Sequence, residues 1–297
     1  MTPADVRLSD APGLAEVSAV VQTGEMTSLP LDRLLDAVRV DDTTSIFTVP
    51  DGWQQGRGAF GGLVIGAMVR AATVATNDDS RRVRSVTAEL LGPVLPGPAT
   101  LHIERLHQGS GVSAVRVRLL QDTGAGVVEE QCCAVIVLAK SRPGTPQFSH
   151  RAVPTMPDWR EVDVVAVEPP LGPVFAGNFN FRPTGPWPFS GAPVPVAAGF
   201  IQPREPVTAF DAALVAACAD AWWPAVLSTL QEVRPMATIT FALELLTDPA
   251  HLDPATPLFH DARSETGVDG YCVEHRALWT PDGLLVAENQ QLFAIIC

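Results

Sequence analysis

Gly61 to Thr76 reads GGLVIGAMVRAATVAT, and Arg70 is its only charged residue. Apolar side chains would lie on every side of a helix formed by this stretch. Helices of this kind are buried in the core, whereas surface helices carry a single apolar stripe. The stretch therefore predicts a central helix that the remainder of the fold encloses.

Strand-like segments surround this predicted helix. Thr44 to Val49 reads as a short strand that ends at Pro50-Asp51-Gly52. After the helix, apolar and polar residues alternate, most clearly from Ser113 to Leu119. Glycine-rich turns at residues 109–111 and 124–126 are typical of hairpins. The four predicted strands run roughly Val83 to Leu91, Ala99 to Leu106, Ser113 to Leu120 and Val127 to Leu138.

The same order of elements recurs in the second half of the chain. Thr208-Ala-Phe-Asp211 has the form of a capping box and predicts a second apolar helix reaching about Leu227. Segments 127–131 and 285–289 align, and each continues into an apolar strand. The predicted strands lie near Ala237 to Leu245, Pro257 to Arg263, Tyr271 to Trp279 and Leu284 to Ile296.

A buried helix followed by antiparallel strands, present twice, is typical of tandem hotdog repeats. The predicted class is therefore α+β, with each antiparallel sheet wrapped round a central helix and the repeats packed as an internal pseudo-dimer. The expected divisions are an N-terminal extension (1–40), a first repeat (41–140), a proline-rich linker with an entry strand (141–195) and a second repeat (196–297).

Composition argues against several classes of protein. The 297 residues carry a net charge of −13, which disfavours binding to nucleic acid. The apolar runs are shorter than the roughly 20 residues of a membrane span. We see no signal peptide, because Asp5, Arg7 and Asp10 stand where an apolar segment would be needed. Five cysteines without a C-x-x-C pair suit reduced thiols, so we expect a cytoplasmic protein.

Familiar catalytic motifs are weak or missing. Gly56 to Gly61 matches G-x-G-x-x-G, but hairpins follow it where a dinucleotide-binding fold has β-α-β units. The glycines could instead present backbone N–H groups at a helix N-terminus. The sequence has no G-x-S-x-G motif, and its six histidines do not form a zinc motif. We therefore expect neither a metal nor another cofactor.

Asp220 stands out on the second predicted helix. It follows eight apolar or small residues, Ala212 to Ala219, and precedes Ala221-Trp222-Trp223. A buried carboxylate is costly unless it is hydrogen-bonded. Pro224, four residues later, lacks the N–H that would bond the Asp220 carbonyl. A bland alternative is that this face of the helix meets water near its end.

With Asp220, the chain resembles the acyl-CoA thioesterase II family of double-hotdog enzymes. Ala237-Thr238-Ile239 resembles the strand that carries the family's threonine. Asp282 to Ala287, followed by Gln291, resembles the segment that carries its glutamine. The resemblance implies Asp220, Thr238 and Gln291 as catalytic residues. Phe60-Gly61-Gly62 resembles the entry to the family's first helix, so the N–H groups of Gly61, Gly62 and Leu63 are candidates to bind the thioester oxygen.

The resemblance implies hydrolysis of fatty acyl-CoA to a fatty acid and CoA, in a homo-oligomer of double-hotdog chains. Asp220 would be a general base or, by direct attack through an anhydride, a nucleophile, and the sequence does not separate the two. Thr238 and Gln291 would orient the water. Thr240 is a rival for the role of Thr238, because the two should share a strand face. Two alternatives stay open: a non-catalytic acyl-CoA or lipid-binding protein, and a hydratase or dehydratase.

The repeat predicts a single catalytic site in each chain. The first helix contains no Asp or Glu, so it offers no counterpart to Asp220. Aligning the last strands places Cys133 opposite Gln291, and Ser85 is the expected counterpart of Thr238. The first half would then contribute glycine N–H donors to a site whose polar side chains come from the second half.

Overall fold

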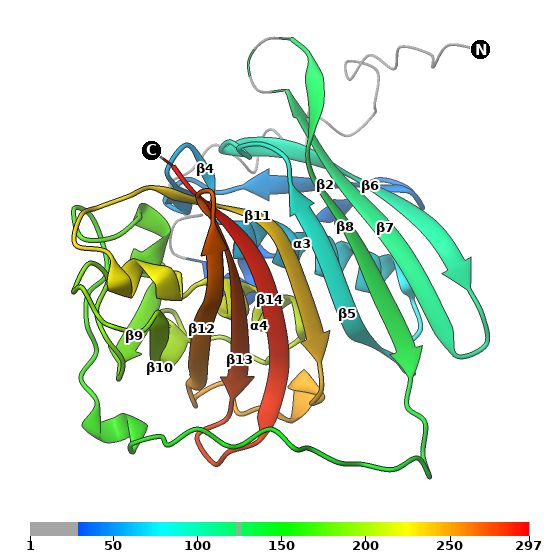
Figure 1. Ribbon diagram of the computed structural model, residues 1–297. Coiled ribbons are helices and arrows are strands. Elements are labelled where there is room, and N and C mark those ends of the chain that lie inside the picture. Colours follow the sequence, from blue (N-terminus) through cyan, green and yellow to red (C-terminus); the bar gives the residue numbers. More distant parts are fainter. Residues whose placement is uncertain (1–28, 123, 125, 297) are drawn as a thin grey trace.

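The chain forms one continuous antiparallel sheet of 12 strands that curves around two helices (Figure 1). The computed structural model describes residues 29–122, 124 and 126–296. Most of the predicted N-terminal extension therefore lies outside the described residues. The strand order is β1-β2-β6-β7-β8-β5-β11-β14-β13-β12-β10-β9.

The first half contains the helix predicted from sequence, with the same bounds. This helix, α3, is buried along nearly its whole length. A short hairpin of β3 and β4 precedes it and forms a separate two-stranded sheet. The elements are α2 (Leu31–Leu34), β1 (Val38–Arg39), β2 (Thr44–Val49), β3 (Gln54–Gln55), β4 (Gly58–Ala59), α3 (Gly61–Thr76), β5 (Arg81–Leu90), β6 (Gly97–Gln108), β7 (Val112–Asp122) and β8 (Val128–Lys140).

The second half repeats this order, with β10 in the place of β2 and α4 in the place of α3. Strand β9 comes from the proline-rich region and forms one edge of the sheet, as β1 forms the other. The elements are β9 (Phe179–Pro183), β10 (Val196–Pro203), α4 (Ala212–Asp220), β11 (Met236–Leu245), β12 (Leu258–Val268), β13 (Tyr271–Trp279) and β14 (Leu285–Ile295), with 3-10 turns η3 (Trp159–Glu161), η4 (Val174–Asn178), η5 (Ala225–Thr229) and η6 (Pro249–His251).

Helix α4 is shorter than the sequence predicted. Its N-cap is Asp211, whose carboxylate accepts the Leu214 N–H at 2.8 Å. Thr208 is not the cap, because its N–H and hydroxyl both donate to Asp32. The helix ends at Asp220, four residues before Pro224, in keeping with the N–H that proline lacks.

The two halves meet where β5 pairs with β11, and the register of this pair is symmetric. Thr240 pairs with Glu89, Ser85 pairs with Glu244, and Ala242 pairs with Thr87 between them. Each of the two strands also carries a β-bulge. The bulge in β11 lies at Ile239, between Thr238 and Thr240; the bulge in β5 lies at Arg84, between Val83 and Ser85.

These bulges fix which residues of the two halves correspond. Thr238 pairs with Phe293 as Val83 pairs with Leu138, so Val83 is the counterpart of Thr238. By the same register, Ile136 corresponds to Gln291. The expected counterparts, Ser85 and Cys133, are therefore wrong. The β7–β8 hairpin extends further than β13–β14, which matching of similar residues along the sequence could not detect.

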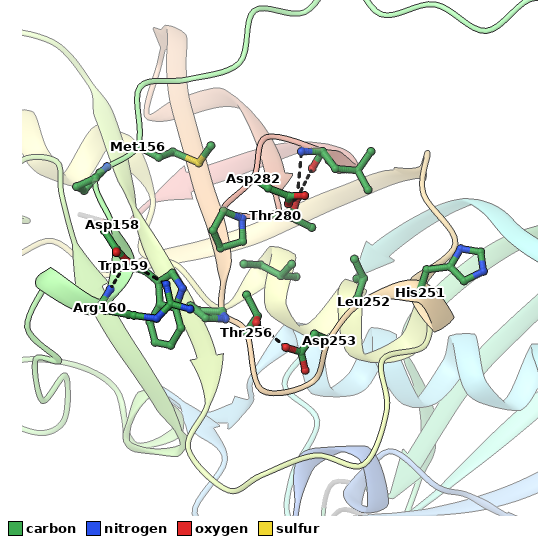
Figure 2. Close-up of a pocket in the computed structure, with 15 residues that line it drawn as sticks. Met156, Asp158, Trp159, Arg160, His251, Leu252, Asp253, Thr256, Thr280 and Asp282 are labelled. Carbon is green, nitrogen blue, oxygen red and sulfur yellow. Dashed lines mark hydrogen bonds and ion pairs between the residues drawn. The ribbon is translucent and has the colours of Figure 1, made fainter.

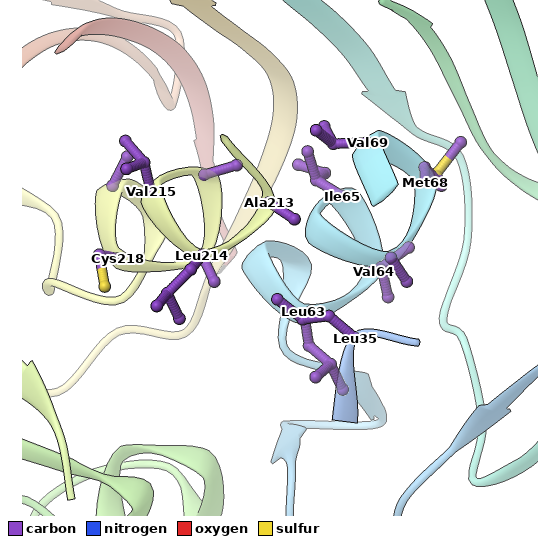
Figure 3. Packing of buried hydrophobic residues seen from close by; sticks show 14 of the residues in the cluster. Leu35, Leu63, Val64, Ile65, Met68, Val69, Ala213, Leu214, Val215 and Cys218 are labelled. Atoms are coloured by element: carbon purple, nitrogen blue, oxygen red, sulfur yellow. The ribbon is translucent and has the colours of Figure 1, made fainter. Parts of the chain in front are cut away.

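The helices cross the core in opposite directions and touch through small residues. A side chain at Gly62 would meet the Ala217 carbonyl, and one at Gly66 would meet the Ala213 carbonyl, each at 2.9 Å. Figure 3 shows α3 and α4 packed side by side, with Ala213 next to Ile65. Close approach of the backbones brings the N-terminus of α3 to the C-terminus of α4.

One segment, Ala212–Thr229, is apolar and long enough to cross a membrane by composition alone, with a mean hydropathy of 1.3. It includes α4, and 72% of it is buried inside the protein. A core helix passes the same test, so this is weak evidence for a membrane span.

Candidate active site

The three polar residues singled out in the second half lie together in a hydrogen-bonded chain. Asp220 ends α4 and is 8% exposed. Gln291 on β14 is fully buried and donates from Nε2 to Asp220 Oδ1 at 3.0 Å. Thr238 on β11 donates its hydroxyl to Gln291 Oε1 at 3.4 Å. Residues separated by up to 71 positions are thus brought into one cluster.

The bulge at Ile239 decides which threonine joins this cluster. Paired residues on neighbouring strands point to the same face of a sheet. Thr238 is opposite Phe293 and Thr240 is opposite Leu292, which are consecutive residues and so face opposite ways. The two threonines therefore lie on opposite faces, and the expectation that they share one is wrong. Sequence alternation could not reveal the extra residue.

A fourth residue, Asn289, holds the Gln291 amide in place. Its side-chain oxygen accepts the second Gln291 Nε2 hydrogen bond at 2.9 Å. Its own Nδ2 donates to the Ala242 carbonyl at 2.7 Å. Both hydrogens of the Gln291 amide are consequently occupied, by Asp220 and by Asn289. Sequence reasoning missed Asn289, although its position two residues before Gln291 on one strand puts both side chains on the same face.

A buried ion pair supports the end of α4. Arg276 on β13 is 1% exposed and donates from Nε to Glu274 at 2.7 Å. Its terminal nitrogen Nη1 donates to the Ala219 carbonyl at 2.9 Å and reaches the Asp220 carbonyl at 3.4 Å. A cation is favourable at a helix C-terminus, where carbonyl groups lack partners. Arg276 was not predicted as a site residue from the sequence.

Glu274 is also fully buried. It connects the 3-10 turn η5, which follows α4, to strand β13. Its Oε2 accepts the Ala225 N–H at 2.6 Å and the Ser264 hydroxyl at 2.8 Å. The pair of Arg276 and Glu274 therefore fixes the backbone on both sides of Pro224. This support determines where the Asp220 side chain lies.

Opposing effects act on the pKa of the Asp220 carboxyl. Burial raises its pKa above the ordinary value, and the negative charge of Glu274 adds to this. The charge of Arg276, the hydrogen bond from Gln291 and the N–H of Gly62 act in the other direction. Burial prevails, so the pKa of Asp220 is raised. A carboxyl with a raised pKa is a stronger base once it is ionised.

The glycines at the start of α3 lie directly against this carboxyl. A side chain at Gly61 would come within 2.8 Å of Asp220 Oδ2. The N–H of Gly62 faces the carboxyl and favours its ionised form, and the N–H of Leu63 bonds the Phe60 carbonyl at 3.1 Å. Two of the three backbone donors proposed for the thioester oxygen thus have other partners, which leaves Gly61.

A pocket of about 540 Å³ opens beside Gly61 and Thr238, and both halves of the chain line it. One wall comes from the β3–β4 hairpin, α3 and the end of β5; the other comes from the start of β11. Most of the side chains are apolar, including Val64, Leu90 and Ile239. Ligand sites are typically apolar clefts with few polar groups, in this range of size.

A second pocket, of about 610 Å³, lies away from these residues (Figure 2). Its lining includes Trp159, Arg160 and Asp253 but no member of the Asp220 cluster. Its aspartates bond locally, as Asp253 does to Thr256 at 2.8 Å.

Metal and thiol chemistry have little support in the described part of the chain. No group of three or more His, Cys, Asp or Glu residues there could hold a metal ion. Burial raises the pKa of Cys218 to about 12 and that of Cys272 to about 11, so neither thiol is a ready nucleophile.

Comparison with known families decides the family of this chain. The N-terminal domain of acyl-CoA thioesterases matches residues 49–139, and the C-terminal domain matches residues 149–295. The chain belongs to the acyl-CoA thioesterase family. It is an acyl-CoA thioesterase with two tandem hotdog domains. No curated protein matches the sequence of this thioesterase.

Solved structures share the fold of this thioesterase. A conserved protein of unknown function with a hotdog fold from Alicyclobacillus acidocaldarius has a TM-score of 0.81 and 20% identity, over 90% of this chain and 98% of that one. A putative thioesterase II from Thermobifida fusca has a TM-score of 0.75 with the same identity and coverage. Acyl-CoA thioesterase II TesB2 from Mycobacterium marinum has a TM-score of 0.68 and 18% identity, over 89% and 97%.

Proposed function

We propose that this thioesterase hydrolyses medium- or long-chain fatty acyl-CoA, with Asp220 as the base that activates water. The observation that carries the proposal is the hydrogen-bonded chain from Thr238 through Gln291 to Asp220, placed beside an apolar pocket. The polar groups suit hydrolysis, and the apolar lining suits an acyl chain.

The proposed reaction begins with a water molecule held between Asp220 and the thioester carbonyl. Asp220 takes a proton from the water as its oxygen bonds to the carbonyl carbon. The carbonyl oxygen becomes an oxyanion, which the Gly61 N–H stabilises at the positive end of α3. The carbon–sulfur bond then breaks, and the CoA sulfur leaves with the proton from Asp220, so that acid and thiol are formed.

Gln291 and Thr238 have different roles in this proposal from those expected from the sequence. Both Gln291 amide hydrogens are already bonded, so Gln291 orients the Asp220 carboxylate instead of donating to the water. Its Oε1, which accepts from Thr238, has a second lone pair for a hydrogen of the water. Thr238 lines the pocket and is the member of the chain that meets substrate.

The two repeats are proposed to act as an internal pseudo-dimer. The site depends on both repeats. The Asp220 carboxyl group comes from α4, and the glycines that contact it come from α3. Neither half has the full set. The symmetric register at the junction of β5 and β11 supports this arrangement.

A hydratase or dehydratase would need a histidine facing the substrate beside the carboxylate. His260 is the histidine in contact with the residues at the end of α4, but it is fully buried and stacks on Trp222 at 5.3 Å between ring centroids. Burial lowers its pKa well below the ordinary value. This favours a structural role, and hydrolysis is the better proposal.

The test is release of free thiol from acyl-CoA of increasing chain length, without added metal or nucleotide. We expect turnover with medium or long chains and little with acetyl-CoA, because the pocket wall is apolar. A thiol-trapping assay that stays at background for every chain length would contradict hydrolysis. Saturable binding in the absence of turnover would instead favour the acyl-CoA-binding alternative.

A further inference from the structure

A large groove lies beside the start of β5 and the end of β11. The reaction pocket lies at the other end of this strand pair. The groove has a volume of about 1220 Å³. The start of β5, the end of β8 and the segment that follows β8 form one side, and Leu246 and Thr247 after β11 form part of the other. In Figure 1 the chain leaves the lower end of β8 here and crosses below the lower ends of the second-half strands toward β9.

The register of the two halves makes this groove the counterpart of the reaction pocket. Arg82 and Arg84 correspond to Ala237 and Ile239 of the pocket lining, because Arg84 and Ile239 are the bulge residues of their strands. Arg82 and Ala237 each lie two residues before the bulge. Leu246 likewise corresponds to Leu91. The catalytic counterparts in this half are apolar, with Val83 for Thr238 and Ile136 for Gln291. The groove therefore cannot perform the same hydrolysis.

In place of catalytic groups, the groove carries positive charge. Its lining includes five cationic residues, namely Arg82, Arg84, Lys140, Arg142 and Arg151. They gather in a chain whose net charge is −13 and in which Lys140 is the only lysine. Some of this charge is neutralised, because Arg82 pairs with Asp248 at 2.7 Å and Arg151 pairs with Glu288 at 2.9 Å.

Two guanidinium groups converge on one neutral oxygen. Arg82 donates to Ser141 Oγ at 2.6 Å, and Arg84 approaches the same oxygen at 3.5 Å. Within the described residues, Arg84 makes no ion pair with a carboxylate, although Asp248 lies near enough to influence it. Burial and the charge of Arg82 both lower the pKa of Arg84. Two like charges that share a neutral acceptor repel each other, and an anion between them would remove that repulsion.

We propose that this groove binds a phosphate-bearing anion, with Arg82, Arg84 and the Ser141 hydroxyl holding one phosphate group. Guanidinium groups match the geometry of phosphate oxygens and can donate two parallel hydrogen bonds. Lys140 and Arg142 supply further charge beside them. Phe148, Val153 and Leu246 form an apolar wall that would take the organic part of the ligand. The proposal does not depend on the proposed reaction, since none of these residues belongs to the Asp220 cluster.

Titration calorimetry with inorganic pyrophosphate, ADP and CoA tests the proposal. We expect saturable binding of at least one probe that weakens about tenfold or more in Arg84→Gln, since hydrogen bonds to charged groups are worth about 1.5–3 kcal/mol. Arg116→Gln is the matched control, because Arg116 lies on the neighbouring part of the sheet and pairs with Glu104 outside the groove. Binding to this control should equal that of the unmodified protein.

The three probes also identify the source of the phosphate. Equal affinity for pyrophosphate and ADP means that the phosphate alone is recognised; tighter binding of ADP or CoA means that the apolar wall takes part. Arg84→Gln should keep its acyl-CoA hydrolysis and its melting temperature, which separates this site from the reaction pocket. Absence of binding for every probe, or equal binding in Arg84→Gln and the unmodified protein, would overturn the proposal.

Discussion

Asp220 is buried, and the proposed mechanism requires it to be ionised. Its environment raises the pKa, so the folded protein binds a proton at Asp220 more readily than the unfolded chain does. The ionised form therefore costs stability as the pH rises from the ordinary aspartate range through the raised pKa of the folded state. In the proposed mechanism activity has the opposite dependence, because Asp220 must be ionised to take a proton from water.

Asp220→Asn is expected to lower kcat by at least about 10²-fold, in line with the usual contribution of a general base. At neutral pH its stability should be equal to or greater than that of the unmodified protein, because a buried charge is removed. Thiol release and thermal unfolding measure the two effects. Near-normal turnover in a folded variant would assign Asp220 a structural role.

Glu274→Gln is expected to shift the acid limb of the kcat/KM profile to lower pH. Glu274 raises the pKa of Asp220 by like-charge repulsion. Glutamine removes the charge, and its one amide oxygen can still accept from Ser264 and Ala225. Disturbing a buried ion pair can cost about 3–5 kcal/mol, so the profile is recorded well below the melting temperature.

The control for this variant is Glu288→Gln. Glu288 lies on β14, and its half-exposed carboxylate pairs with Arg151. The acid limb of Glu288→Gln should coincide with that of the unmodified protein. An unchanged profile in Glu274→Gln, or a shift toward higher pH, would show that the ion pair does not adjust the base.

At the scale of elements, the bulge in β11 and the close contact of the two helices build the site. The bulge turns Thr238 toward Gln291 and Thr240 away from it. Small residues on α3 and α4 let the helix ends approach until Gly61 meets the Asp220 carboxyl. Each effect acts through the backbone, and each places a polar group where the proposed mechanism uses it.

The bulge predicts different results for the two threonines. Thr238→Val should lower kcat/KM by about fivefold, the value of one hydrogen bond of roughly 1 kcal/mol in the site. Thr240→Val is the matched control and should leave kcat/KM unchanged, because its side chain lies on the other face of the sheet. Thiol-release kinetics on both variants decide the matter; a larger loss in Thr240→Val would contradict the assignment.

For the whole molecule, one chain is expected to contain one catalytic site. The register gives Val83 and Ile136 as counterparts of Thr238 and Gln291, and α3 has no acidic residue. A single site should therefore bury one acyl chain. Titration with a non-hydrolysable acyl-CoA analogue that carries an environment-sensitive fluorophore on its acyl group should saturate at one equivalent per chain. Saturation at two would require a second acyl pocket.

The sequence by itself determined the repeated module and the identity of the polar residues. The all-apolar stretch Gly61 to Thr76 predicted a core helix, and α3 has those bounds. Strands were predictable because their alternation depends only on local spacing. Asp220 was recognisable because a carboxyl group among apolar residues is costly, and that cost is visible in the sequence alone.

Only the tertiary structure decided how these residues meet. A single extra residue in β11 reverses the face of Thr238 relative to Thr240, and alternation in a sequence cannot show an insertion that the partner strand reveals. The support from Arg276, Glu274 and Asn289 depends on contacts between distant strands. Arg82 and Arg84 correspond to the pocket residues Ala237 and Ile239 through the hydrogen-bond register. That register is a property of the assembled sheet and not of either segment.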